Sequence, residues 1–440
     1  MPLAKTPDTP ETLGDSPERR ASMMNDKNLT YIELFAGSGG LAEGLLRAGF
    51  EPIAHIEMDK YAALTLKTRL SYHYLKKNGR LEIYYDYLKR KISRQELYNI
   101  ISPIELKTVI NVEIINKNIS WLIDLIKENM KQKKVKKVEV LAGGPPCQAY
   151  SIIGRARDPY KMKKDRRNYL YRLYVRFLEA FKPSVFIFEN VPGLLSAGNG
   201  RLWQDIQKYF KNAGYEAGYR LLNAHDFGVL QNRKRVIVIG WRKELNLEYP
   251  EFKKDSNINR FRVIEVFDDL PPLKPGERIY TGAYIKKPSE YMKMYGIRDE
   301  EDILTLHIAR KHNERDREIY RFYIEAWLKE KRRPEYDELP EELKTHRNKR
   351  VFRDRFKVVA PDLPYSQTVV AHLEKDGHYF IHPDINQLRS ISVRETARLQ
   401  SFPDNFYFEG PMTAMFRQIG NAVPPLMAEK IAEKIKEMVG

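Results

Sequence analysis

Short apolar runs alternate with segments of helical periodicity from Thr30 onward. This alternation is typical of a parallel sheet whose strands are joined by helices, so we expect an α/β protein. The pattern predicts one helix over Leu41–Ala48 and a second from about Lys60 to Leu70. The expected strands are Tyr31–Phe35, Pro52–Ile56, Val138–Ala142, Val185–Phe188 and Val236–Gly240.

Two long segments interrupt this alternation. The first, residues 71–137, is rich in Lys, Tyr and Ile, and we expect mostly helix there with one strand near Val109–Ile115. Its lysine run, Lys131–Lys137, is more typical of a solvated face than of a DNA contact. The second, residues 241–365, carries many charges and several prolines but few clear strands, which indicates a second domain. An amphipathic helix over about Leu426–Val439 is expected to close the chain.

The composition adds a strong positive charge and a single cysteine. The 440 residues include 76 Lys and Arg against 59 Asp and Glu, a formal net charge of +17. This excess suggests a polyanionic partner, although a basic enzyme with no nucleic-acid partner fits the charge equally well. One cysteine excludes an internal disulfide framework and a zinc site built from several thiolates. Residues 1–28 are polar and contain no apolar signal segment, and no stretch approaches the length of a membrane span, so we expect a cytoplasmic protein.

The first predicted strand leads into a glycine-rich loop. In open parallel sheets ligands bind beyond the carboxyl ends of the strands, and glycines let them approach the backbone closely. Gly37 and Gly39 could simply form a tight turn, but Glu57 closes the second strand, where an acid would bind a ribose. The order of loop, helix, strand and acid therefore predicts a nucleoside cofactor. The loop lacks the G-x-G-x-x-G spacing of dinucleotide sites, which favours a cofactor without pyrophosphate such as S-adenosylmethionine.

The only cysteine, Cys147, follows the predicted strand Val138–Ala142 through a Gly-Gly-Pro-Pro turn. The glycines permit tight backbone and each proline fixes φ, so the turn displays the thiol at the ligand edge. A lone cysteine is most often a small buried hydrophobic residue. A buried structural cysteine has little need of such a turn, and we therefore favour Cys147 as a nucleophile.

Polar groups also stand at the ends of two later strands. Glu189 follows Val185–Phe188, where a partly desolvated carboxyl group can act as an acid near neutral pH. Capping of the next helix is the structural alternative for Glu189. Arg233 and Arg235 precede Val236–Gly240, and strand alternation places both on one face, where they could hold a carbonyl oxygen or a phosphate. A solvated basic strand end is the alternative for this pair.

Six motifs in this order resemble the DNA cytosine-5 methyltransferase family of prokaryotic restriction–modification type. They extend from about Thr30 to Val439, with gaps at residues 71–137 and 241–365. The resemblance implies the fold of an S-adenosylmethionine-dependent methyltransferase, a Rossmann-like mostly parallel sheet with helices on both faces plus a smaller target recognition domain. The motifs are FAGSGG (Phe35–Gly40), GGPPCQ (Gly143–Gln148), ENV (Glu189–Val191), QNRKR (Gln231–Arg235), RSISVRETARLQSFPD (Arg389–Asp404) and QIGNAVPP (Gln418–Pro425).

The expected domain organisation combines these motifs with the composition. A disordered leader over residues 1–28 is followed by a catalytic and cofactor-binding domain over residues 29–265, which contains the insertion 71–137. The target recognition domain is expected over residues 266–400. Residues 401–440 would return to the catalytic domain, so that the last helix packs beside the first strand.

The resemblance implies methyl transfer from S-adenosylmethionine to C5 of a cytosine that is flipped out of a specific duplex sequence. Cys147 would add to C6 and convert the ring into an enamine. Protonated Glu189 would donate to N3 and contact the exocyclic amine, while Arg235 holds the O2 side with support from Arg233. The base that removes the C5 proton is not identified by the sequence, and no metal is expected.

The resemblance also implies residues that bind the cofactor and the DNA. Glu57 would hold the ribose hydroxyls, Met58 would lie by the adenine, and Asn118 would stand where the family has an Asp that reads the adenine amino group. The basic run Arg347–Lys357 supplies candidates for contacts with phosphates or bases. The complete cofactor set is Phe35, Gly37, Ser38, Gly39, Glu57, Met58, Asn118, Pro145, Asn421 and Val423, and the DNA set is Gln148, Ser151, Gln231, Arg347, Arg350, Arg353 and Arg355.

Two other functions are compatible with this fold. One is an RNA cytosine-5 methyltransferase that acts on tRNA, and the other is a catalytically silent DNA-binding module. Intact Cys147, Glu189 and Arg235 argue against the silent module. The expected partners are double-stranded DNA and a cognate restriction endonuclease, and the expected state is a monomer. The sequence does not reveal the DNA recognition site.

Overall fold

The computed structural model describes residues 29–146, 169–344 and 353–440. Within these ranges seven strands form one sheet in the order β3-β2-β1-β4-β5-β7-β6. The five strands from β3 to β5 are parallel, whereas β7 is antiparallel to both β5 and β6. The predicted fold, a mostly parallel sheet with helices, is confirmed. The strands are β1 (Thr30–Leu34), β2 (Glu51–Glu57), β3 (Val109–Asn111), β4 (Val140–Gly143), β5 (Val185–Asn190), β6 (Tyr215–Asn223) and β7 (Lys234–Arg242).

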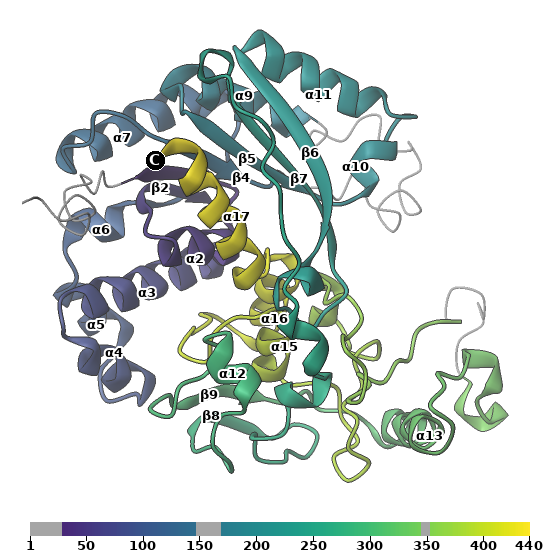
Figure 1. Ribbon diagram of the computed structural model, residues 1–440. Helices are drawn as coiled ribbons and strands as arrows, with labels where there is room; N and C mark the ends of the chain where they lie inside the picture. The colour runs from purple at the N-terminus through teal and green to yellow at the C-terminus, as the bar shows by residue number, and fades with distance from the viewer. Residues whose placement is uncertain (1–28, 147–168, 345–352) are drawn as a thin grey trace, which may run out of the picture.

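Helices cover both faces of this sheet (Figure 1). Successive side chains of a strand point to opposite faces, so Tyr31 joins one apolar cluster and its neighbour Ile32 joins the other. The helices on the Tyr31 side are α2 (Gly40–Arg47), α3 (Lys60–Lys77) and α17 (Pro425–Val439). The helices on the Ile32 side are α7 (Ile119–Gln132), α9 (Leu170–Phe181) and α11 (Arg201–Asn212). No helix in the described ranges is long and apolar enough to cross a membrane.

The last helix, α17, packs directly on α2. A Cβ added at Gly44 would lie 2.4 Å from the carbonyl carbon of Ala428, and one at Gly40 would lie 2.1 Å from the Val423 carbonyl oxygen. The absence of side chains at these two glycines therefore lets the end of the chain approach the first helix of the sheet. Arg47 adds an ion pair with Glu429 at 3.2 Å.

The interrupting segment between β2 and β4 is mostly helical, as predicted, and contains one short strand, β3. Helix α3 runs past the predicted end at Leu70 because polar residues such as Thr68 and Arg69 are buried in it, which hides the apolar periodicity. Three further helices follow and form a small apolar cluster of their own around Tyr84 and Leu97. They are α4 (Leu81–Leu88), α5 (Arg94–Ile100) and α6 (Pro103–Lys107).

A second assembly of elements follows β7. Its hairpin joins β8 to β9, and α13 packs with its own apolar cluster at a distance from the sheet (Figure 1). The chain then returns through α15 and α16 to α17. These elements are β8 (Arg278–Gly282), α12 (Glu290–Met294), β9 (Leu304–Ile308), α13 (Glu314–Glu330), α15 (Val393–Leu399) and α16 (Met412–Asn421). The short helix α10 (Gly193–Ser196) is not part of this assembly, since it lies earlier in the chain and contacts α11.

Charged side chains fill the interior around α15. Arg398 has no exposed surface and bonds to Asp404 and Asp269, each at 2.5 Å. Arg389 pairs with Glu395 at 2.7 Å, and although burial opposes ionisation, Arg389 holds the pKa of Glu395 well below its usual range. Because a buried charge without its partner is costly, these pairs fix the position of the motif that contains them.

Three buried histidines surround the same motif. His307 contacts the hydroxyl of Ser392 at 2.9 Å, and His312 contacts that of Ser390 at 3.0 Å. Burial lowers the pKa of His307 to about 4 and the pKa values of His312 and His382 to about 3. All three are therefore neutral in the folded protein near neutral pH.

The glycine contact between α2 and α17 can be tested with Gly44→Ala. Alanine favours an exposed helix by about 1 kcal/mol over glycine, but overpacking typically costs about 1–3 kcal/mol. We expect the variant to lower the midpoint of thermal unfolding, because its Cβ meets the backbone of α17. Lys430→Ala, on the exposed side of α17, is the matched control and should leave the midpoint unchanged. A stabilised Gly44→Ala protein would contradict the close packing.

The buried histidines predict a loss of stability in mild acid. In the unfolded chain these histidines have a pKa of about 6.5 and bind protons once the pH falls below that value. In the folded protein they bind protons only when the pH falls to about 4 for His307 and to about 3 for His312 and His382. The midpoint of thermal unfolding should therefore fall between about pH 7 and about pH 5, a range in which most carboxyl groups do not titrate. His307→Gln should reduce this slope. A midpoint that does not change over this range would show that the histidines are not held neutral.

Candidate functional site

The loop between β1 and α2 is built on unusual backbone conformations. Phe35 has a φ of 57°, Gly37 of 56° and Gly39 of 87°. Glycine adopts such angles without strain, whereas an aromatic residue does so only where its surroundings enforce it. The N–H of Gly37 donates to Glu57 Oε2 at 2.7 Å, which ties the loop to the end of β2. The glycine loop and Glu57, which the sequence places 20 residues apart, are therefore in direct contact.

Glu57 is held by backbone donors on both oxygens. Besides Gly37, the N–H of Asp59 donates to Oε1 at 2.7 Å. Burial raises the pKa of Glu57, and the two N–H donors oppose that rise because they favour the charged form. The amide of Asn111, at the end of β3, donates to the carbonyl oxygens of Glu57 and Met58 at 2.8 and 3.1 Å. The Met58 side chain, 62% exposed, lies at the surface beside this carboxylate.

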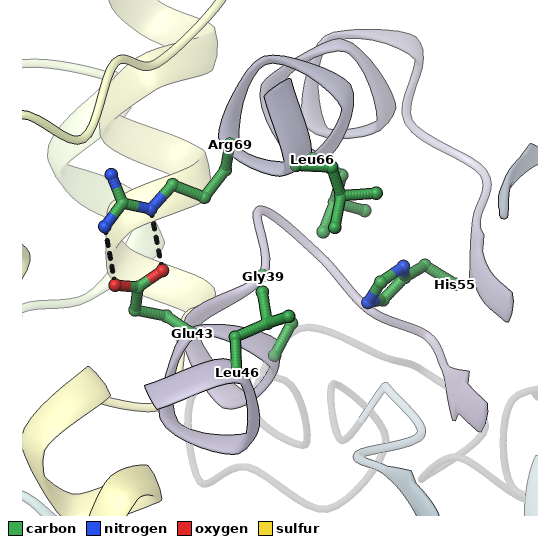
Figure 2. A pocket seen from close by; sticks show the side chains of 8 residues that line it. Gly39, Glu43, Leu46, His55, Leu66 and Arg69 are labelled. Atoms are coloured by element: carbon green, nitrogen blue, oxygen red, sulfur yellow. Dashed lines mark hydrogen bonds and ion pairs between the residues drawn. The ribbon is translucent and has the colours of Figure 1, made fainter. Parts of the chain in front are cut away.

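The space available to a ligand lies on the outer side of the glycine loop. A Cβ added at Gly37 would meet no atom within 4 Å, whereas one at Gly39 would lie 2.6 Å from Leu66. Behind Gly39 is a cavity of only about 10 Å³, lined in part by His55 and by the Glu43–Arg69 ion pair (Figure 2). That volume suits about one water molecule. A nucleoside would therefore have to bind on the open side, beside Gly37 and Glu57.

The C-terminal motif reaches this loop. Ser38 is 1% exposed, and its hydroxyl donates to the Gln418 carbonyl oxygen at 3.5 Å. Val423 contacts the start of α2 through its carbonyl oxygen, and Asn421 is exposed at the end of α16. The expected return of the chain to the loop is thus present. Because the Ser38 hydroxyl is buried, a ligand in this loop would contact the backbone of Ser38 and not its hydroxyl.

Asn118, which the family resemblance implies as a cofactor residue, bonds within its own loop. It lies before α7, where its side-chain oxygen accepts from the Ile115 N–H at 3.1 Å and its amide donates to the Glu113 carbonyl oxygen at 2.8 Å. Both ends of the side chain are therefore used within its own loop. The residue that adjoins Glu57 and Met58 from β3 is instead Asn111.

A second group of polar side chains lies at the ends of β4 and β5. Glu189 lies over the Gly143–Pro146 turn, so close that a Cβ at Gly144 would lie 2.6 Å from its Oε2. Arg235 Nε lies 2.8 Å from Glu189 Oε1, and both side chains remain partly exposed. The amide of Asn190 donates to the Pro145 carbonyl oxygen at 3.2 Å and so fixes the turn. Glu189 and Arg235 thus form one polar site beside the turn that leads to Cys147.

Two residues expected at this site are buried away from it. Arg233 has no exposed surface and donates to the carbonyl oxygens of Val369, Gly420 and Ala422 at 2.6, 3.1 and 2.9 Å. Its side chain is therefore separated from that of Arg235, contrary to the expectation that the two act on one face. Gln231 is also fully buried, and its amide bonds to Leu399, Gln400 and Val369, which places it out of reach of DNA.

The remaining predicted DNA residues fall into two groups. Arg353 is exposed and pairs with Glu335 at 2.6 Å, while Arg355 is half-buried and pairs with Asp376. Both lie after α13, in the second assembly. The predictions for Cys147, Gln148, Ser151, Arg347 and Arg350 lie outside the described residues, as does the expected leader over residues 1–28.

The structure adds a bridge that the sequence did not suggest. Asp59 caps α3 by accepting from Tyr61 and Ala62, and its second oxygen receives Arg417 at 2.8 Å. Arg417 also pairs with Glu374 at 3.1 Å. The Asp59 cap could have been found from its place before a helix. Its partners are more than 300 positions away in the chain, so no local signal identifies them.

Comparison with known proteins agrees with this arrangement. The model of the family described as C-5 cytosine-specific DNA methylase matches residues 29–86 and 110–437. The chain is 42% identical to the type II methyltransferase M.Bpa9945I of Bacillus paralicheniformis, over 93% of this chain and 99% of that protein. It is 30% identical to the type II methyltransferase M.DdeI of Desulfomicrobium norvegicum, over 92% of this chain and 88% of the other.

A solved structure shares the fold. It is that of a protein described as a DNA modification methyltransferase encoded within an E. coli prophage. The TM-score is 0.60 at 22% identity, and the match covers 93% of this chain and 99% of that one. The sheet and its covering helices are therefore an arrangement already known in another protein.

Arg233→Met tests whether this arginine supports the site from the interior. The variant removes a donor from three buried carbonyl oxygens, of which only that of Ala422 keeps another donor among the described residues, Gln400 at 3.1 Å. A buried acceptor left without a partner costs about 1–3 kcal/mol. We expect a free energy of unfolding lower by about 3 kcal/mol or more, followed as a reduced thermal midpoint. Arg321→Met, on the exposed face of α13, is the control and should have almost no effect. Equal, small losses in both variants would contradict the internal role.

Proposed function

The chain belongs to the C-5 cytosine-specific DNA methylase family and is a DNA cytosine-5-methyltransferase, and from this premise we propose how it acts. It transfers a methyl group from S-adenosylmethionine to C5 of a flipped-out cytosine in a specific duplex sequence. The observation that carries this proposal is the Glu189–Arg235 pair, which adjoins the turn leading to the only cysteine.

S-adenosylmethionine supplies a methyl group on a sulfonium, ready for attack by a carbon nucleophile. The loop from Phe35 to Gly39 would bind it on the open side beside Gly37, where there is room against the backbone. Glu57 would accept hydrogen bonds from the ribose hydroxyls, since its carboxylate is fixed there by Gly37 and Asp59. Met58 would lie by the adenine, and Pro145, Asn421 and Val423 would complete the pocket.

Cys147 would be the nucleophile. Cytosine C5 is a poor nucleophile while it belongs to the aromatic ring. Addition of the thiolate to C6 breaks the C5–C6 double bond and places its electron pair on C5. C5 would then take the methyl group, and the electrons of the broken S–CH3 bond would stay with the cofactor, which would leave as a neutral thioether. A base removes the proton from C5, the double bond forms again and the thiolate leaves. The prolines at 145 and 146 stiffen the chain that carries this thiol.

Glu189 and Arg235 would hold the ring during this addition. N3 and O2 are neighbouring acceptors on cytosine, and two contacting side chains suit two neighbouring atoms. Glu189 in its protonated form would donate to N3 and accept from the exocyclic amine, which withdraws charge from the ring as the thiolate attacks. Arg235 would donate to O2. Because Asn190 ties β5 to the Pro145 carbonyl, the carboxyl group and the cysteine turn keep one relative position.

Arg233 and Gln231 would then act as positioning residues. Both bond to Val369, and Arg233 also holds the carbonyl oxygens of Gly420 and Ala422. They join the strand that carries Arg235 to the QIGNAVPP motif, which itself contacts the glycine loop. A base-holding residue and the cofactor pocket are thereby connected through one buried network.

Residues 266–400 would form the target recognition domain. Arg353 and Arg355, together with Arg347 and Arg350, are our candidates for contacts with the duplex, mostly with phosphates. The basic excess of the chain favours such a polyanion, since each neutralised phosphate releases counterions. Because relatives carry the name type II methyltransferase, we further propose a cytoplasmic, monomeric modification enzyme that protects DNA from a cognate restriction endonuclease.

The covalent step is tested by a duplex that carries 5-fluorocytosine at the target. Fluorine cannot leave C5 as a proton does, so the protein should remain bound through Cys147 in an adduct that resists denaturation. Cys147→Ala should form no adduct and transfer no labelled methyl group, yet bind the duplex with nearly unchanged affinity. Adduct formation by the alanine variant would remove Cys147 from the mechanism. Methyl transfer to tRNA but not to duplex DNA would instead overturn the proposed substrate.

A further inference from the structure

Helices α4, α5 and α6, together called the addition here, have a role that the proposed reaction does not explain, although most of α4 lies within the family match. The matched family residues leave positions 87–109 uncovered, which are the end of α4, all of α5 and α6, and the start of β3. Helices α4 and α5 lie beyond the end of α3, and the end of α4 lies beside the hairpin of β8 and β9, whereas α6 lies away from it against β3 and α7 (Figure 1). Helix α4 therefore stands between α3, which starts shortly after Glu57, and an element of the second assembly.

The addition is anchored on the segment that leads from α15 to α16. Tyr84 donates to the Asn405 carbonyl oxygen at 2.8 Å, and its ring is fully buried. Glu409, only 4% exposed, accepts from Tyr87 at 2.6 Å and from Arg94 at 3.0 Å. Thr68 of α3 donates to the same carboxylate at 2.6 Å. These bonds make α3, the addition and the 402–410 segment one connected body.

The end of α4 contacts the hairpin itself. Thr281 of β8 donates to the Leu88 carbonyl oxygen at 2.8 Å. The guanidinium of Arg90 lies 4.3 Å from the centre of the Tyr280 ring, a cation–π distance. Tyr85 adds a hydrogen bond to Asp302, just before β9, at 3.3 Å. The hairpin therefore contacts the end of α4 twice, through a hydrogen bond to its backbone and through the Tyr280 ring beneath Arg90.

The backbone of Arg90 offers a way to remove its side chain without strain. Arg90 follows the C-cap of α4 with a φ of 61°, a left-handed position that usually carries glycine. An arginine there is less favourable than glycine, so glycine can replace it without backbone strain. Lys134 holds the same position after α7, with a φ of 55° and the same N–H bond to the carbonyl three residues earlier.

We propose that α4, supported by α5, is a brace that holds the β8–β9 hairpin in the placement that receives duplex DNA, with Arg90 as its positioning residue. The hairpin is also bonded to the RSISVRETARLQSFPD motif, because Arg394 of that motif donates to the Thr305 carbonyl oxygen of β9 at 3.0 Å. Without the brace the hairpin samples other placements, and DNA binds to a smaller competent fraction. This inference rests on the proposed function only for its DNA readout.

Arg90→Gly separates the brace from ordinary stability, because glycine suits the left-handed backbone and removes the ring contact. We expect an unchanged or higher thermal midpoint, faster amide hydrogen exchange in β8 and β9, and a KM for duplex DNA raised about threefold with kcat unchanged. Arg90→Lys keeps a cation over Tyr280 and should restore both readouts. Lys134→Gly makes the same backbone change after α7 and should alter neither exchange in the hairpin nor the KM for DNA.

The two readouts distinguish failure of the brace from failure of the proposed function. If Arg90→Gly leaves hydrogen exchange in β8 and β9 equal to that of Lys134→Gly, the brace is overturned whatever the activity. If exchange rises but KM for DNA stays constant in an active enzyme, the link to DNA uptake is wrong. If the unmodified protein transfers no methyl group to duplex DNA, the proposed substrate fails, while the exchange measurement still decides whether the hairpin is braced.

Discussion

Because β2, β1, β4 and β5 run parallel, their carboxyl ends meet at one edge of the sheet, and the other features of the site depend on this register. Leu34 pairs with Ile56 on one side and with Gly143 on the other, and Gly143 pairs with Phe188. The glycine loop, Glu57, the cysteine turn and Glu189 follow those positions directly. The register of the parallel strands alone thereby brings four loops to one edge of the sheet, and no contact between the side chains of those loops is needed.

The loops are then held by segments that return from the second half of the chain. Glycines at 40 and 44 let the C-terminal motif and α17 lie against α2, and Arg233 connects that motif to the strand of Arg235. Buried ion pairs around Arg398 fix α15 between these parts. Removal of one partner from such a pair is more damaging than the pair is stabilising, so the network specifies one arrangement of the two assemblies.

Much of this arrangement could be predicted from the sequence, because it depends on local patterns. Apolar runs located the buried parallel strands, and the order of motifs located the glycine loop, Glu57 and Glu189. Strand β6 was missed because it lies at the sheet edge with an exposed outer part, which blurs its alternation. Burial of Arg233 and Gln231 could not be inferred, since a motif shows which residues recur and not which way they point. Partners such as Arg417 for Asp59 are set by tertiary contacts alone.

The central proposal is that this chain methylates cytosine at C5 in duplex DNA, with Cys147 as the nucleophile and with Glu189 and Arg235 holding the ring. Bisulfite sequencing of DNA from a host that expresses this chain measures that outcome directly. The account predicts that cytosines within one short sequence are protected from conversion throughout the genome, and that the same cytosines convert fully in a host expressing the Arg235→Ala protein. Complete conversion at every site in both hosts, with the protein folded and present, would contradict it.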